Sequence, residues 1–195
     1  MGSLPTYRES TIPENAKKVF EGAIFDVYQW EQELYDGSYA TFEKLARADT
    51  AIVFPILEDG RILLIHEEQP GKKTEYVPPA GRVEPNETPE EAAVRELKEE
   101  TGYEVTELIP LYTHTPASKI DWFIYAFIGK GCKQVETQNP DAGERIELAP
   151  VTFDEMVQHT IKEGPFYHYG YFTKIIQNAL LDEECMNELR TLFSV

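Results

Sequence analysis

Apolar and polar residues alternate through the N-terminal part of the chain. In residues 20–46 this pattern is interrupted by Asp36-Gly37, a pair typical of a tight hairpin turn. Two further apolar runs, residues 51–57 and 61–66, flank Glu58-Asp59-Gly60 and predict a second hairpin. The chain is therefore expected to begin with β-strands.

The rest of the chain changes between helical and strand patterns. Residues 67–86 are polar and rich in proline and glycine, so they predict a loop. Residues 88–101 predict a helix, with Thr88 as N-cap, Pro89 at the first helical position and Gly102 after the last turn. Further strands are expected near 104–114, 121–128 and 145–152, and further helices over 154–162 and 172–192. This order predicts an α/β fold of the α+β or layered α/β/α kind rather than a doubly wound sheet.

Composition places the chain among soluble proteins that form their own core. It has 195 residues, of which 42% are hydrophobic, enough for one domain with a modest extension. No apolar run approaches the roughly 18–20 residues that span a bilayer, and the first residues lack the features of a secretory signal. Cys132 and Cys185 have no metal-ligand spacing, so we expect reduced thiols and a cytoplasmic location.

The charge balance limits the possible partners. The net charge of −17 disfavours nucleic acid and an anionic membrane surface as partners, because both require basic residues. An acidic protein can still act on phosphates where divalent cations bridge the two negative partners. The position of the acidic residues therefore matters more than their number.

A stripe of carboxylates lies on the predicted helix 88–101. At about 100° per residue, Glu96, Glu99 and Glu100 fall within roughly 100° of the helix surface. Like charges at this spacing destabilise an isolated helix, whereas converging carboxylates suit hard cations such as Mg²⁺ or Mn²⁺. From the helix alone, a solvated acidic face is the alternative interpretation.

The residues around this stripe fit a longer pattern. The string is Gly81-x5-Glu87-x7-Arg95-Glu96-Leu97-x-Glu99-Glu100-x-Gly102-Tyr103. It resembles the Nudix box of the Nudix hydrolase superfamily at every fixed position, with Tyr103 where a smaller aliphatic residue is commoner. The resemblance implies a Nudix α/β/α sandwich with a mixed sheet. It also implies hydrolysis of a nucleoside diphosphate linked to another moiety.

The resemblance also implies roles for individual residues. Glu96, Glu99 and Glu100, with the carbonyl oxygen of Gly81, would hold Mg²⁺ or Mn²⁺. Glu99 and Arg95 are also expected to serve catalysis, and Arg95 would brace the loop by pairing with Glu87. Metal ions suit this chemistry because they neutralise phosphate charge and lower the pKa of bound water.

Several segments outside the box resemble the branch of ADP-ribose pyrophosphatases and nucleotide-sugar hydrolases. These segments are Arg47–Leu57, Arg61–Ile65, Pro79-Ala80-Gly81 and Pro116. The branch implies a homodimer that exchanges an N-terminal segment between subunits. We therefore expect residues 1–48 to form a β-rich dimerisation segment and 49–195 the Nudix hydrolase domain. The alternative is a hairpin that folds on its own subunit.

The chain also departs from this branch. His66-Glu67-Glu68-Gln69 stands where the branch has Arg-Gln-aromatic-Arg, so a phosphate-contacting arginine is missing unless Lys72 or Lys73 replaces it. Ala117 follows Pro116 where the branch has glycine, and Asp121 falls near the position of a glutamate. The residues expected to bind substrate are Arg47, Arg82, Pro116 and Asp121.

A loop glutamate is expected to act as the base. Glu144 is the first candidate and Glu147 the second, while a solvated loop acid is the alternative interpretation. The expected activity is metal-dependent cleavage of a small nucleotide such as ADP-ribose into a nucleoside monophosphate and a sugar phosphate. A dinucleoside polyphosphate hydrolase and a non-catalytic ligand-binding Nudix domain are the alternatives. The intact trio Glu96, Glu99 and Glu100 favours an enzyme.

Overall fold

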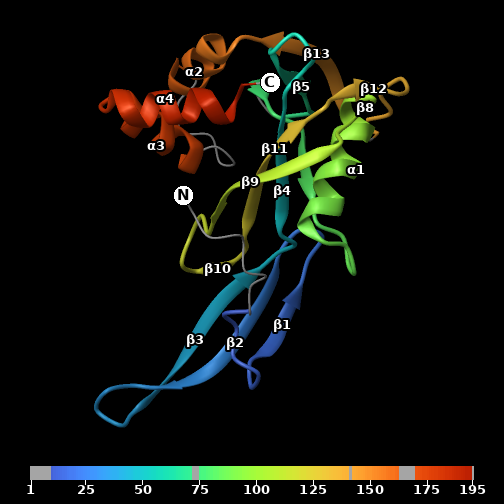
Figure 1. Ribbon diagram of the computed structural model, residues 1–195. Helices are drawn as coiled ribbons and strands as arrows, with labels where there is room; N and C mark the ends of the chain where they lie inside the picture. The colour runs from blue at the N-terminus through green and yellow to red at the C-terminus, as the bar shows by residue number, and fades with distance from the viewer. Residues whose placement is uncertain (1–9, 72–74, 141, 163–169, 195) are drawn as a thin grey trace.

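The computed structural model describes residues 10–71, 75–140, 142–162 and 170–194, and it shows an α/β body from which an N-terminal β-sheet arm projects (Figure 1). The strands are β1 (Lys17–Glu21), β2 (Asp26–Glu33), β3 (Tyr39–Ala46), β4 (Thr50–Pro55), β5 (Ile62–Glu68), β6 (Glu75–Val77), β7 (Ala80–Arg82), β8 (Tyr103–Glu104), β9 (Glu107–His114), β10 (Ile120–Asp121), β11 (Ile124–Lys130), β12 (Lys133–Gln134) and β13 (Arg145–Val151). The helices are α1 (Pro89–Thr101), α2 (Phe153–Lys162), α3 (Gly170–Ala179) and α4 (Glu183–Leu192). Within the described ranges, no helix is long and apolar enough to cross a membrane.

A mixed sheet with strand order β7-β4-β11-β9 forms the centre of the body. β11 runs parallel to β4 and antiparallel to β9. Successive residues of a strand face opposite sides of the sheet, so Ala51 and Val53 of β4 share a core with Leu97 of α1. Ile52 and Phe54 belong to the core on the other face. The central sheet is therefore buried on both sides, which explains its continuous apolar runs.

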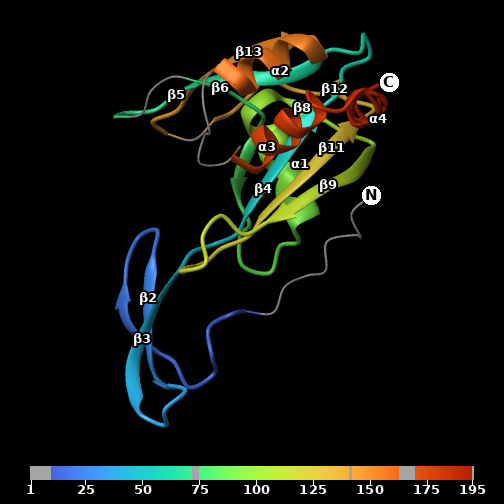
Figure 2. The same cartoon turned by 90° about the vertical axis from the view of Figure 1, so that its left-hand side faces the viewer.

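The other face of the central sheet is covered by a second sheet, β13-β5-β6, and by the C-terminal helices (Figures 1 and 2). Phe54 of β4 packs there against Phe172 of α3, with ring centroids 4.6 Å apart, and against Phe193 at 5.6 Å. The layers are thus α1, the central sheet, and a mixed layer of strands and helices. This arrangement matches the predicted α/β/α sandwich.

The N-terminal arm is an antiparallel sheet of β1, β2 and β3 that extends away from the body (Figure 2). The predicted turn at Asp36-Gly37 is confirmed: Gly37 has a φ of 81°, and the Leu34 N–H donates to the Ser38 carbonyl over 2.8 Å. β3 also pairs in parallel with β10, which joins the arm to the body.

The predicted hairpin of residues 51–57 and 61–66 is only partly correct. The Leu57 N–H donates to the Arg61 carbonyl over 2.8 Å, so the turn forms. β4 and β5 then separate into different sheets, because β4 pairs with β7 and β11 while β5 pairs with β6 and β13. Both strands are almost fully buried, and apolar patterning does not identify the partners of such strands.

Two other expectations were wrong in detail. Residues 67–86, expected as loop, contain the short strands β6 and β7, which pair with β5 and β4 respectively. The helix expected over 172–192 is two helices, because Asp182 begins a new one. The Asp182 carboxylate accepts the backbone N–H groups of Glu184 and Cys185 over 2.9 and 3.3 Å.

Candidate active site

Helix α1 carries the carboxylates of the candidate site, and its two ends are fixed locally. Thr88 accepts the Glu91 N–H, and the Glu91 side chain accepts the Thr88 N–H, so a capping box starts the helix. Gly102 ends it in the left-handed region with a φ of 76°. The predicted caps are therefore confirmed.

Glu100 is the most buried acid of the stripe, with 5% of its surface exposed. Its carboxylate accepts the backbone N–H of Ala80 over 3.1 Å. Burial is the main cause that raises the pKa of Glu100 well above the ordinary carboxyl value, and the charge of Glu96 raises it further. Glu67 and Glu144 add smaller contributions in the same direction. Four carboxylates from three parts of the chain therefore lie near one another.

Strand β7 lies directly over this group of acids. A Cβ atom on Gly81 would lie 2.0 Å from the carboxyl carbon of Glu96, so a side chain at this position would displace the Glu96 carboxylate. Gly81 and Glu96, both expected as metal ligands, are thus brought into contact.

Arg95 ties the helix to the preceding loop, as predicted. Its Nε donates to Glu87 over 2.8 Å and its Nη2 over 2.9 Å. Its Nη1 also donates to Glu96 over 2.7 Å and to Glu99 over 3.0 Å, and the Arg82 carbonyl accepts from Nη2. The hydrogen bond to Glu87 is the main cause that raises the pKa of Arg95, so this cation stays charged and braces the site.

The acids fit a hard divalent cation. In the part of the chain that the structure describes, no three histidine, cysteine or acidic side chains already form a cation site. Arg95 binds Glu96 and Glu99, and the Ala80 N–H donates to Glu100. The donor set consists of carboxylate oxygens, which Mg²⁺ and Mn²⁺ prefer. A buried acid whose neighbours are also acids gains from a cation that offsets their charge.

One candidate base lies just before β13 and the other lies within it. Glu144 precedes β13 and contributes to the electrostatic environment of Glu100. Glu147 pairs with His66 of β5, and its side chain is exposed. Because faces alternate along a strand, residues 144 and 147 point to different sides. The structure therefore brings Glu144, and not Glu147, to the carboxylate group.

Sequence reasoning missed Glu67 and Gln69 as members of the site. Glu67 is only 9% exposed and lies on β5 in the same alternation as the buried Leu63 and Ile65. Gln69 follows β5 and donates to Glu67. The sequence did contain a signal for Glu67, because this acid occupies a position of the strand where buried apolar residues alternate. The expected replacements for the missing arginine, Lys72 and Lys73, lie outside the described residues.

The residues expected to bind substrate are distributed over two regions. Arg82 is exposed beside the carboxylates and pairs with Glu84 over 3.2 Å. Arg47 lies at the junction of arm and body, where its guanidinium stacks 4.3 Å from the Trp122 ring. Pro116 is half-buried between β9 and β10, in the same region.

Asp121 is engaged by the chain's own N-terminal part. It is 4% exposed, and its carboxylate accepts the Ser10 hydroxyl over 2.9 Å. It also accepts the Thr11 N–H over 3.1 Å and the Thr11 hydroxyl over 2.6 Å. These contacts hold the segment before β1 against β10.

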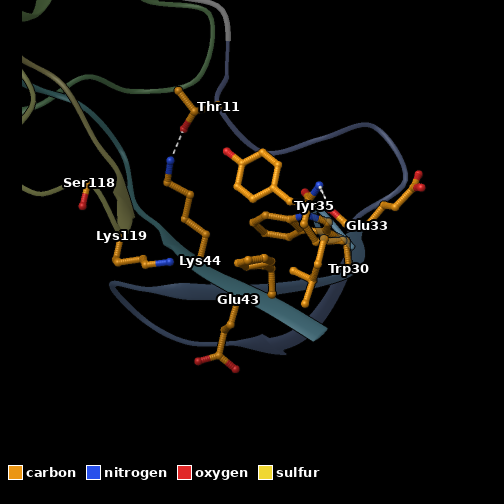
Figure 3. Close-up of a pocket in the computed structure, with 11 residues that line it drawn as sticks. Thr11, Trp30, Glu33, Tyr35, Glu43, Lys44, Ser118 and Lys119 are labelled. Carbon is orange, nitrogen blue, oxygen red and sulfur yellow. Dashed lines mark hydrogen bonds between the residues drawn. The ribbon is translucent and has the colours of Figure 1, made fainter. Parts of the chain in front are cut away.

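The arm contains an aromatic pocket of about 410 Å³ (Figure 3). Trp30 and Phe42 stack at its wall with ring centroids 6.1 Å apart. Lys119 places its ammonium 5.3 Å from the Phe42 ring, and Lys44 donates to Thr11 at the rim. Glu33 and Glu43 also line the pocket, so its charges are balanced, and the stacked rings favour a flat ligand such as a nucleotide base.

Known proteins share both this fold and this sequence pattern. The NUDIX domain family matches residues 46–170. An ADP-ribose pyrophosphatase of Bacillus subtilis (strain 168) is 27% identical over 158 residues, which cover 80% of this chain and 84% of that protein. A methanol dehydrogenase activator of Bacillus methanolicus is 30% identical over 170 residues, covering 86% and 89%. The solved structure of an ADP compounds hydrolase shares the fold with a TM-score of 0.65 at 19% identity, over 93% of this chain and 98% of that one.

The chain therefore belongs to the NUDIX family and is a Nudix hydrolase. Its resemblance to the ADP-ribose pyrophosphatase branch is confirmed, and so is the predicted fold class.

Proposed function

We propose that this Nudix hydrolase cleaves the diphosphate of a nucleoside diphosphate linked to a sugar, with ADP-ribose as the representative substrate. The single observation that carries the proposal is the group of carboxylates around the buried Glu100, which lies beside Gly81 of strand β7. Such a group has excess negative charge, which a divalent cation and its phosphate ligands would offset together. The curated relative named for ADP-ribose supports the choice of substrate.

Glu96, Glu99 and Glu100, with the carbonyl oxygen of Gly81, would hold Mg²⁺ or Mn²⁺. When bound, the cation supplies neutralisation of phosphate charge and makes an attacking water more acidic. Arg95 holds Glu96 and Glu99, and its contact with Glu87 ties them to the loop before α1.

Glu144 is the residue proposed to accept the proton of the attacking water. It comes from a different element than the ligands on α1 and is half-buried at the edge of the same group. A carboxylate that is committed to a cation is a poor base, because the cation stabilises its charged form. The water oxygen bonds to one phosphorus, the bridging P–O bond breaks, and the leaving phosphate takes the electron pair. Arg82 is exposed nearby, where it can pair with the phosphate charge.

The aromatic pocket of the arm is proposed to hold the base of the nucleotide. Its stacked rings belong to the arm (Figure 3), whereas α1, the helix that carries Glu96, Glu99 and Glu100, belongs to the body (Figure 1). A homodimer in which residues 1–48 reach the partner's site would bring the two parts together. The exposed apolar side chains of the arm, Phe20 and Ile24 among them, support such an assembly.

The test is a hydrolysis assay of the full chain with ADP-ribose in the presence of Mg²⁺ or Mn²⁺. The expected products are equimolar AMP and ribose 5-phosphate, separated by anion-exchange chromatography, with no reaction after the metal is removed by EDTA. A parallel panel contains other nucleotide sugars and diadenosine polyphosphates. Faster cleavage of the diadenosine compounds would support the alternative substrate class. Absence of hydrolysis across the panel with either metal would overturn the proposal.

A further inference from the structure

Gln69 connects two carboxylates that come from different segments of the chain. Its Nε2 donates to Glu67 Oε1 over 2.5 Å and to Glu144 Oε1 over 2.8 Å. An amide nitrogen has two N–H groups, so both hydrogen bonds can form at once. A flipped amide would instead place its oxygen against two carboxylates, so the electrostatics select one orientation of this side chain.

The backbone places Gln69 and Glu144 opposite each other. In the antiparallel ladder of β5 and β13, Ile146 pairs with Glu67 and Arg145 pairs with Glu68. The next pair in this register is Glu144 and Gln69, one residue beyond each strand. Glu67 belongs to strand β5 and is 9% exposed, whereas Glu144 is the loop residue directly before β13.

The surroundings of Glu144 favour such a tie. Glu144 and Glu67 are both acids within electrostatic range of Glu100. Repulsion would turn a loop carboxylate out toward water unless a donor holds it. Gln69 supplies this donor without adding a positive charge, so the group keeps its full attraction for a cation.

We propose that Gln69 is a positioning residue that holds the Glu144 carboxylate beside Glu100 by linking it to the strand acid Glu67. This inference rests on the proposed function, in which Glu144 accepts the proton of the attacking water. Gln69 itself touches no reacting atom. Its effect passes through Glu144, and this makes the effect separable from that of substrate binding.

The first test compares Gln69→Met with Gln177→Met. Methionine keeps the length of the glutamine side chain and removes both donors, and Gln177 is an exposed glutamine on α3. Gln69→Met should lower kcat about tenfold and change KM for ADP-ribose by less than about twofold, because an acid that moves affects the chemical step rather than binding. Gln177→Met should match the wild type.

The second test asks whether the effect passes through Glu144. The double variant Gln69→Met/Glu144→Gln should be no slower than Glu144→Gln alone, whereas independent roles would multiply the two losses. Hydrogen exchange of the metal-free protein provides a readout without activity. The amides of residues 142–148 should exchange faster in Gln69→Met, while those of α1 stay unchanged.

The outcomes separate the inference from the proposed function. A wild-type protein that hydrolyses ADP-ribose, with a Gln69→Met variant of equal kcat, would overturn the inference alone. Multiplicative losses in the double variant, or unchanged exchange in residues 142–148, would also overturn it. A wild-type protein without hydrolase activity on the whole panel would overturn the proposed function, and the inference would fall with it.

Discussion

Glu100 combines burial with negative neighbours, and a substitution there tests the carboxylate group most directly. Glu100→Gln should keep the fold, because a glutamine oxygen can still accept the Ala80 N–H that now bonds Glu100. It should lower kcat by about two orders of magnitude or more, since a neutral amide is a weak ligand for a hard cation. The measurements are kcat at saturating Mg²⁺ and the affinity for Mn²⁺ by calorimetry.

The control for this variant is Glu188→Gln, an exposed acid on α4. This substitution removes the same charge as Glu100→Gln, but on α4 instead of α1, and it should leave kcat unaltered. A folded Glu100→Gln protein with near-wild-type kcat and Mn²⁺ affinity would show that Glu100 is not a ligand.

His114 provides a pH-dependent contribution to stability. Burial is the main cause that lowers its pKa below the usual 6.5, and the charge of Lys174 lowers it further. The unfolded chain therefore binds a proton more readily than the folded chain. Stability is fully present above pH 6.5 and is lost as the pH falls through that value toward the folded pKa.

The prediction for this histidine is a difference between two pH profiles. His114→Phe keeps an aromatic ring against Tyr171, whose centroid lies 4.6 Å from that of His114. Urea unfolding between pH 5 and 8 should show a wild-type free energy that decreases at low pH more steeply than that of His114→Phe. Parallel profiles for the two proteins would contradict the assignment.

Individual residues differ in how far the sequence could place them. The pairing of Glu87 with Arg95 followed from the motif, and the structure shows it. Asp121 was expected to bind substrate. Its carboxylate accepts hydrogen bonds from Ser10 and Thr11, which lie 111 and 110 positions earlier in the chain. Glu67 was missed because its neighbours in the carboxylate group come from elements that are distant in the sequence. Pairings across such separations are not visible in a single sequence.

At the scale of elements, Gly102 limits how α1 can end. Its φ of 76° is strained for other residues, and a Cβ there would lie 2.2 Å from the Glu136 carbonyl oxygen. Gly102→Ala should therefore destabilise the protein by about 1–3 kcal/mol, through backbone strain and displacement of residue 136. Urea denaturation measures this loss.

The matched control is Gly170→Ala at the start of α3, where a Cβ would meet no atom of the described residues within 4 Å. This variant should leave stability unchanged or raise it by up to about 1 kcal/mol, because alanine restricts the unfolded chain. Equal stability of the two variants would show that the end of α1 tolerates a side chain.

Elements that depend on neighbouring residues were predicted well, and those that depend on distant partners were not. The Asp36-Gly37 turn and both caps of α1 depend on local chemistry, and all three are present. The strands β6 and β7 have three residues each and exist because β5 and β4 offer them hydrogen bonds. β4 and β5 likewise belong to different sheets because β4 pairs with β7 and β11, whereas β5 pairs with β6 and β13.

At the scale of the whole molecule, the arm leaves large apolar side chains in water. Phe20 is 58% exposed, Ile24 63% and Tyr39 64%. A second copy of the chain would bury such side chains, and closed dimers are the commonest assembly of soluble proteins. Light scattering should therefore give the mass of a dimer at micromolar concentration. Ile24→Glu should weaken the dimer, whereas Leu181→Glu, at an 89% exposed position outside the arm, should not.

The same assembly predicts how two inactive variants behave when they are mixed. Trp30→Ala removes one wall of the aromatic pocket in the arm, and Glu100→Gln removes an acid of the body. If the arm of one subunit completes the site of its partner, each mixed dimer contains one site with both parts intact and one with neither. Random exchange of subunits then restores about a quarter of the wild-type activity. If each arm serves its own subunit, every site in the mixture lacks one part and no activity returns. A monomer by light scattering would refute the dimer itself, whereas a dimer without complementation would refute only the exchange of arms.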